Sequence, residues 1–136
     1  MKILIADDDP DDRNLASIAF KELKLGHGIE FVHDGQELID YLKHKLILKG
    51  VLPDLILLDL NMPRKNGKAV LSEIKSNPEL QHLDIVVFST SSCDEDKRHS
   101  LDLGAKNYVI KPYDYIELLR ILKNICDEAQ VPRSVN

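Results

Sequence analysis

The sequence has few cysteines and no long apolar run, and both absences narrow what the chain could be. Of its 136 residues only Cys93 and Cys126 are cysteines, and they form no C-x-x-C pair, so we expect reduced thiols and no disulfide. No apolar stretch approaches the roughly 20 residues that cross a bilayer. The apolar run after Met1 is also too short for a signal peptide. These features predict a cytoplasmic protein with no membrane partner.

The chain also lacks a concentrated basic region. Its 23 acidic and 18 basic side chains give a formal net charge of −5, and the basic ones occur in short groups such as Arg64/Lys65 and Lys97/Arg98. Because nucleic-acid surfaces usually carry a long basic run or interleaved aromatic residues, direct binding to nucleic acid is not expected. The five histidines show no metal-ligand spacing either.

What the chain does contain is an ordinary composition for a single folded unit. Hydrophobic residues make up 43% and charged residues 30%, and the length suits one domain. We assign residues 1–126 to that domain. The remaining residues, 127–136, include Pro132 and have little apolar content, so we assign them to a short C-terminal tail.

Apolar runs alternate five times with segments of helical periodicity. The first, third and fourth runs are almost continuously apolar, which is typical of strands buried on both faces of a parallel sheet. The predicted strands are residues 2–6, 29–33, 54–58, 84–88 and 107–110. The helical segment at residues 94–103 has few apolar residues and should be the most weakly anchored. The pattern predicts an α/β fold with a doubly wound, five-stranded parallel sheet and five helices.

Polar residues follow four of these strands at the point where each ends. In a doubly wound sheet of order 2-1-3-4-5, ligands bind beyond the carboxyl ends, and the first and third strands are neighbours. Carboxylates there repel each other by roughly 4 kcal/mol per pair at 4 Å and an effective dielectric near 20. A cation is therefore needed, either a divalent metal with oxygen ligands or the Lys111 amine. The strand-end residues are Asp7, Asp8 and Asp9, then Asp59 and Asn61, then Ser89 and Thr90, then Lys111 and Pro112.

Taken together, these motifs resemble the receiver domain of two-component response regulators. The resemblance rests on the acid pair after the first strand, the aspartate in LLDLNMP, the hydroxyl after the fourth strand and the Lys-Pro after the fifth. It covers residues 2–125 and implies a flavodoxin-like topology. The stretches ADDDPDDR and STSSCDED are most similar to single-domain receivers that work with phytochrome-like histidine kinases.

By this resemblance Asp59 is the phosphoacceptor, which takes a phosphoryl group from a sensor histidine kinase or a histidine phosphotransfer protein. The resemblance also implies a Mg²⁺ (or Mn²⁺) ion held by Asp8, by Asp59 and by the backbone carbonyl of Asn61. Asp7 would act on the metal through a water molecule. The chain would then be a signalling phosphoacceptor and not an enzyme, apart from its own phosphorylation and dephosphorylation.

Three further side chains have roles that the same resemblance implies. Lys111 would pair with Asp59 and then with a phosphoryl oxygen, while Ser89 would donate its hydroxyl to another. Tyr108 would change rotamer as Ser89 moves, and Pro112 would follow a cis peptide bond. The face made of the fourth helix, fifth strand and fifth helix would switch for binding to a downstream protein, whose identity the sequence does not give, or to a second copy in a homodimer.

Two other functions use a similar topology. A haloacid-dehalogenase-like phosphatase also has a strand-end aspartate nucleophile, but it needs a second acid two residues later, where this chain has Asn61. A flavodoxin-like cofactor binder needs a phosphate-binding loop after the first strand, where residues 7–9 are all aspartate. For Asp9 we favour a helix N-cap before Pro10 over metal contact. Ser89 is favoured over Thr90 because it directly follows the apolar run.

Overall fold

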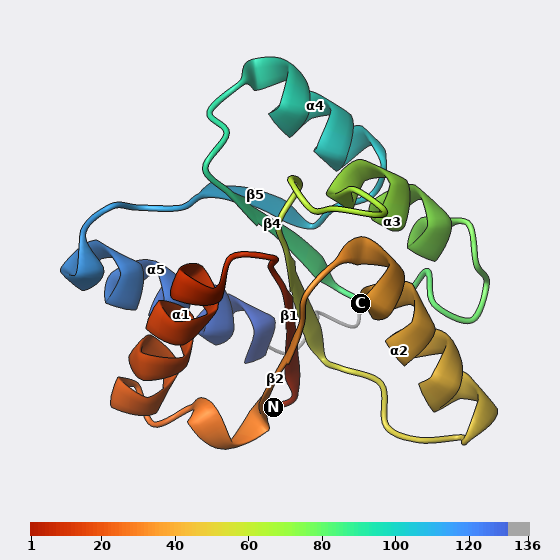
Figure 1. Ribbon diagram of the computed structural model, residues 1–136, viewed down its shortest axis with the longest axis horizontal. Coiled ribbons are helices and arrows are strands. Elements are labelled where there is room, and N and C mark those ends of the chain that lie inside the picture. The colour runs from red at the N-terminus through yellow and green to blue at the C-terminus, as the bar shows by residue number, and fades with distance from the viewer. Residues whose placement is uncertain (131–136) are drawn as a thin grey trace, which may run out of the picture.

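Strands and helices alternate along the whole of the described chain, residues 1–130 of a computed structural model (Figure 1). The elements are β1 (Ile3–Ala6), α1 (Pro10–Glu22), a short 3₁₀ helix η1 (Gly26–Gly28), β2 (Ile29–Val32), α2 (Gly35–Ile47), β3 (Leu55–Leu58), α3 (Gly67–Lys75), β4 (Ile85–Ser89), α4 (Asp94–Asp102), β5 (Asn107–Ile110) and α5 (Tyr115–Gln130). The predicted α/β class with five strands and five α-helices is confirmed.

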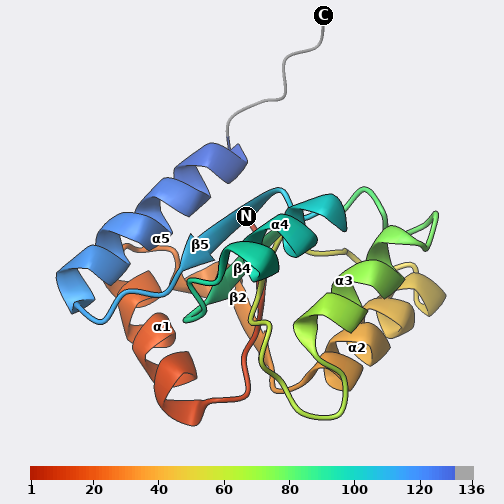
Figure 2. The ribbon, with the colours of Figure 1, turned by 90° about the horizontal axis from the view of Figure 1, so that it is seen from above.

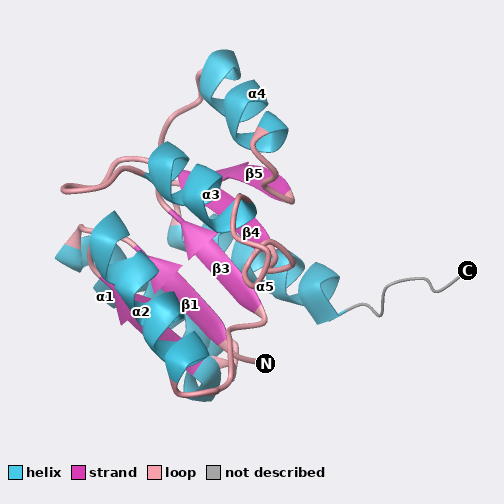
Figure 3. Ribbon diagram, turned by 90° about the vertical axis from the view of Figure 1, so that its right-hand side faces the viewer, coloured by secondary structure: helices cyan, strands magenta, loops and turns pink. Residues whose placement is uncertain are grey.

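All five strands are parallel and lie in the order β2-β1-β3-β4-β5, as predicted. Figure 3 shows the arrows of β1 and β3 pointing the same way. In register, Ala6 at the end of β1 lies opposite Val32 of β2 and Leu58 of β3. Ser89 at the end of β4 likewise lies opposite Ile110 of β5. The residues that follow each strand therefore emerge at one edge of the sheet.

Two hydrophobic clusters, one on each face, hold the sheet between helices. Leu4, Ile56 and Val87 face the cluster that includes the buried side chains of α2 and α3. Alternate residues of the same strands face the second cluster, which contains Phe20 of α1 and Leu122 of α5. Figure 2 shows this arrangement, with α1 and α5 on one side and α2 and α3 on the other. Because both faces are covered, β1, β3 and β4 are buried along their whole length.

Helix α4 is anchored differently. The structure describes every residue of α4, and of these only Ser100 is buried, whereas α2 and α3 each bury four residues. This confirms the prediction that the segment is weakly anchored. Polar contacts near its N-terminal end, from Ser91 and Lys68 to Asp96, help to hold it in place.

Side-chain caps fix the starts of three helices close to the strand ends. Asp9 caps α1 by accepting from the backbone N of Asp11 at 2.9 Å, with Pro10 as the first helical residue, as predicted. Asp34 caps α2 and Asn66 caps α3 in the same way. A cap that satisfies an exposed backbone N–H typically stabilises a helix by about 1 kcal/mol. The turn after β1 is therefore held to three residues, all acidic.

One expectation about the backbone is wrong. No cis peptide bond occurs among residues 1–130, so the predicted cis bond before Pro112 is wrong. The trans form is the more stable one for X–Pro bonds by about 0.5–1 kcal/mol.

Helix α5 continues to Gln130, four residues past the predicted domain end at 126. The rest of the predicted tail, residues 131–136, lies outside the described chain. None of the helices within residues 1–130 combines the length and apolar content that a membrane crossing requires.

Candidate functional site

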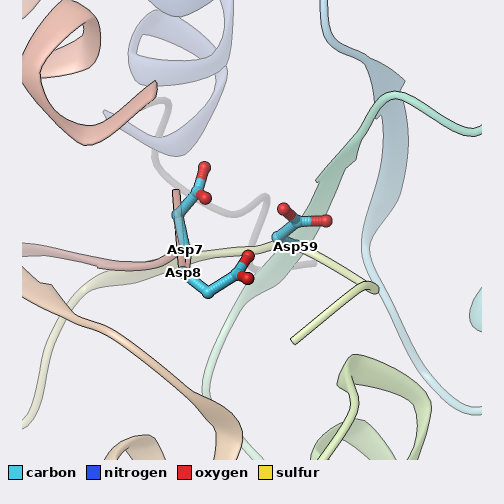
Figure 4. Close-up of side chains that lie close together, drawn as sticks. All are labelled: Asp7, Asp8 and Asp59. Atoms are coloured by element: carbon cyan, nitrogen blue, oxygen red, sulfur yellow. The ribbon is translucent and has the colours of Figure 1, made fainter. Parts of the chain in front are cut away.

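Three aspartates from two neighbouring strands meet at the carboxyl edge of the sheet. Asp7 and Asp8 follow β1, and Asp59 follows β3; one carboxylate oxygen of each lies within 4.8 Å of the other two (Figure 4). Asp7 and Asp59 are buried, at 5% and 8% exposure, while Asp8 is exposed. In Figure 4 the Asp8 carboxylate points toward Asp59. The structure thus brings together the acids that the strand order predicts to be neighbours.

The amine of Lys111 lies among these acids. Its Nζ is 2.6 Å from Asp7 Oδ2, 3.2 Å from Asp59 Oδ2 and 3.1 Å from Asp12 Oδ2. Burial disfavours the charged amine, but the hydrogen bond to Asp7 and the charges of Asp59 and Asp7 outweigh it and raise the pKa of Lys111 above its ordinary value of 10.5. Lys111 is therefore a permanent positive charge at neutral pH.

The Asp59 carboxylate is held in place by the backbone N–H of Asn61 as well as by Lys111. Its Oδ1 accepts from the backbone N of Asn61 at 3.1 Å. Burial raises the pKa of Asp59, and the charge of Lys111 and the Asn61 hydrogen bond offset this only in part. The ionised carboxylate is thus positioned but poorly solvated, which suits a group that reacts by bonding to an electrophile.

The acid cluster suits a hard divalent cation. Every donor is an oxygen, as Mg²⁺ and Mn²⁺ prefer. Two ligands at 2.1 Å from one Mg²⁺ lie at most roughly 4.2 Å apart, which is close to the 4.8 Å within which these three carboxylate oxygens lie. Asp7 already accepts from Lys111 and from the backbone N of Asp9 at 2.9 Å.

Ser89 and Tyr108 meet at a third residue, Ser91, that the sequence pattern did not identify. Ser89 is fully buried at the end of β4, and its Oγ accepts from Ser91 N at 3.2 Å, whereas Thr90 is exposed. Tyr108 is 7% exposed, and its hydroxyl donates to Ser91 O at 2.8 Å. One loop residue therefore connects the β4 hydroxyl to the β5 tyrosine.

The same loop is tied to two helices. Ser91 Oγ donates to Asp96 Oδ2 of α4 at 2.7 Å, and Lys68 Nζ of α3 lies 2.6 Å from Asp96 Oδ1. The hydrogen bonds from Lys68 and Ser91 lower the pKa of Asp96. A movement of the Ser89 hydroxyl can thus reach α4 through two hydrogen bonds. No signal in the sequence singles out Lys68 or Asp96 from other surface charges.

Two glycines, Gly35 and Gly67, allow the loop between β3 and α3 to pack closely against α2 and against its own start, because a side chain at either position would collide with a backbone carbonyl oxygen. A Cβ on Gly35 at the start of α2 would lie 1.9 Å from the carbonyl oxygen of Lys65. A Cβ on Gly67 would lie 2.6 Å from the carbonyl oxygen of Asp59. Because contacts this short would force the backbone apart, both glycines keep the loop against the site.

Comparison with known proteins decides the family. Residues 3–123 match the family model described as the response regulator receiver domain. The chain belongs to this family. A curated relative is the probable methanogenesis regulatory protein FilR2 of Methanothrix harundinacea, 34% identical over 90% of this chain and 79% of FilR2. Another is response regulator Rcp1 of Synechocystis, 32% identical over 90% of this receiver and 84% of Rcp1.

Solved receivers share the fold over almost the whole chain. The phosphorylated cyanobacterial phytochrome response regulator RcpA is 36% identical with a TM-score of 0.87, covering 98% of this receiver and 96% of RcpA. The Mn²⁺-bound form of Rcp1 is 29% identical with a TM-score of 0.79, covering 100% of this receiver and 98% of Rcp1. These likenesses place this receiver among the response regulators of two-component systems.

Proposed function

We propose that this receiver is a phosphoryl-accepting switch in which Asp59 takes a phosphoryl group from a phosphohistidine. The supporting observation is the buried Asp59 carboxylate, which shares one amine, that of Lys111, with Asp7 and lies beside the Asp8 carboxylate. Because RcpA is described as a phytochrome response regulator, we propose a phytochrome-like histidine kinase as the donor. A histidine phosphotransfer protein would present the same phosphohistidine.

In the proposed reaction an oxygen of Asp59 forms a bond to phosphorus while the phosphorus–nitrogen bond breaks. The electron pair of that bond stays on the imidazole nitrogen, which takes up a proton. A carboxylate is a weak nucleophile, so catalysis depends on positioning and on neutralising charge. Asp8, Asp59 and the carbonyl of Asn61 would hold Mg²⁺ or Mn²⁺, and Asp7 would reach it through water. The bound cation would neutralise charge on the phosphoryl oxygens.

The remaining site residues would respond to the phosphoryl group on Asp59. Lys111, which is 3.2 Å from Asp59 Oδ2, would contact a phosphoryl oxygen and stabilise its charge. Ser89 would donate its hydroxyl to another phosphoryl oxygen and release Ser91, and Tyr108 would change rotamer. We infer that the α4–β5–α5 face then changes shape for a downstream protein or a second copy of the chain. The small buried area of α4 supports this, since few contacts must break.

The two alternative functions gain no support from the site. The position two residues after Asp59 is Asn61, which cannot act as the general acid of a haloacid-dehalogenase-like phosphatase. The residues after β1 are acidic and would repel the phosphate of a flavin cofactor.

Intact-mass measurement after treatment with acetyl phosphate and Mg²⁺ tests the proposal. The wild type should gain the mass of one phosphoryl group, which is lost on treatment with hydroxylamine, and EDTA should prevent the gain. Asp59→Asn should gain nothing. Asp54→Asn, which removes an exposed acid at the opposite end of the same strand, is the matched control and should be labelled like the wild type. Full labelling of Asp59→Asn would exclude Asp59 as the acceptor.

A further inference from the structure

Asp12 contacts the amine of the site from a different element than the strand-end acids. It lies in the first turn of α1, with Oδ2 3.1 Å from Lys111 Nζ. Its side chain is 40% exposed, compared with 7% for Asp7 and 11% for Asp59. Asp12 therefore reaches the buried amine from the solvent side of the site.

The amine has as many carboxylate partners as it has protons. A lysine ammonium carries three N–H donors. Three carboxylates, those of Asp7, Asp59 and Asp12, lie between 2.6 and 3.2 Å from Nζ. A ring face of Phe88, 5.9 Å away, and an apolar cavity of about 120 Å³ between α1 and α5 border the same amine. Contact with a phosphoryl oxygen therefore requires Lys111 to loosen a contact that it already makes.

Asp12 is the partner whose contact opposes that movement. Asp7 is held by the backbone N of Asp9, and the Asp59 contact can pass to the oxygens of its own phosphoryl group. Two acceptors of one ammonium lie no more than roughly 6 Å apart, the sum of two hydrogen-bond lengths. A phosphoryl oxygen on Lys111 would thus lie within about 6 Å of the Asp12 carboxylate, and like charges at this distance repel.

We propose that Asp12 is a positioning residue that slows phosphorylation of Asp59 by holding Lys111 and by repelling the incoming phosphoryl group. This inference rests on the proposed function. The side-chain contact of Asp12 at this site is with Lys111, and not with Asp59 or the other strand-end acids, so Asp12 acts through the lysine. Its partial exposure limits the effect, because half-exposed ion pairs contribute modestly.

Phosphorylation kinetics with acetyl phosphate and Mg²⁺ test this role. Asp12→Asn should raise the limiting rate of phosphoryl gain, measured by intact mass, about two- to five-fold, the factor expected for one partly exposed pair. Asp12→Glu, which keeps the charge, should restore a rate close to that of the wild type. Asp11→Asn is the matched control, because Asp11 is also an acid in the first turn of α1 and carries the same charge.

The control separates the contact with Lys111 from general electrostatics. Both asparagine variants lose one negative charge near the helix N-terminus, so both change the attraction of anionic acetyl phosphate to the surface similarly. A faster rate in Asp12→Asn alone supports the inference, and equal rates in Asp12→Asn and Asp11→Asn overturn it. If the wild type gains no phosphoryl group at all, the proposed function fails, and this inference fails with it.

Discussion

Substituting Lys111 by methionine removes the amine that three carboxylates share while it keeps an unbranched side chain of similar length. Removing one partner of a buried ion pair typically costs about 3–5 kcal/mol. Asp7 and Asp59, at 7% and 11% side-chain exposure, would be left as like charges without a counter-charge, whereas Asp12 can turn toward water. We therefore expect the free energy of unfolding to fall by roughly 3 kcal/mol in metal-free buffer, which is about 10 °C in melting temperature for a domain of this size.

Magnesium should reverse much of that loss. A ligand that binds only the folded state stabilises it by RT ln(1 + [L]/Kd), about 1.4 kcal/mol at ten times Kd. Because a divalent cation supplies the missing positive charge, the Mg²⁺-dependent rise in melting temperature should be larger for Lys111→Met than for the wild type. Thermal unfolding followed by circular dichroism, in EDTA and across a Mg²⁺ titration, measures both quantities.

The matched control is Lys123→Met, which removes a lysine of the same charge from a pair with Asp127 at 63% and 61% exposure. Exposed pairs of this kind contribute little, so the control should unfold close to the wild type. If Lys111→Met loses no more stability than Lys123→Met in EDTA, Lys111 is not the counter-charge of the acid cluster. An identical Mg²⁺-dependent rise in melting temperature for the wild type and Lys111→Met would show that the metal ion does not replace the positive charge of Lys111.

Three further predictions concern residues outside the acid cluster. Burial raises the pKa of Cys126 to about 11, whereas Cys93 is exposed, so iodoacetamide at neutral pH should modify Cys93 in the folded protein and both thiols in denaturant; peptide mapping that finds Cys126 modified first would contradict this. Asp96→Asn removes the ion pair between α3 and α4, so amide hydrogen exchange in α4 should quicken, while Glu95→Gln should leave it unchanged. Because the hydrogen bond from Lys68 holds the pKa of Asp96 below 3.8, the protection of the α4 amides in the wild type should persist above pH 3.8 and disappear as the pH falls through the lowered pKa. Equal amide exchange in Asp96→Asn and Glu95→Gln would refute this prediction. Gly35→Ala would place its Cβ 1.9 Å from a carbonyl oxygen of the β3–α3 loop and should cost about 1–3 kcal/mol in urea unfolding; an unchanged midpoint would show that the loop shifts without strain.

The fold could be predicted closely because its strands are short apolar runs between polar turns. The predicted strand 84–88 differs from β4 by one residue at each end, and the other strands agree as well or better. The predicted domain boundary at residue 126 falls inside α5, because the last turn of this helix has little apolar content. Ala129 nevertheless packs against the hydrophobic cluster that contains Phe20 and Leu122, and alanine has a high helix propensity, so the helix continues to Gln130.

The site could be predicted where it depends on strand order and not where it depends on helix packing or loop shape. Parallel strands bring residues that follow β1 and β3 together, which locates Asp7 and Asp59 without any side-chain detail. The contact of Asp12 with Lys111 requires the rotation of α1 over the sheet, which periodicity does not give to the accuracy of one side chain. The sequence does carry one signal, because Asp12 lies in the first turn of the helix that directly follows the acid pair. The bridge through Ser91 depends on the conformation of a single loop and leaves no pattern in the sequence.

The scarcity of buried residues in α4 also bears on how such a chain can diversify. Substitutions at exposed positions usually change folding stability by no more than about 0.5 kcal/mol, so nearly every position of α4 can vary without endangering the sheet. On the proposed partner-binding face, duplicated copies of the gene could therefore acquire different binding specificities through this helix while the strand-end residues stay the same.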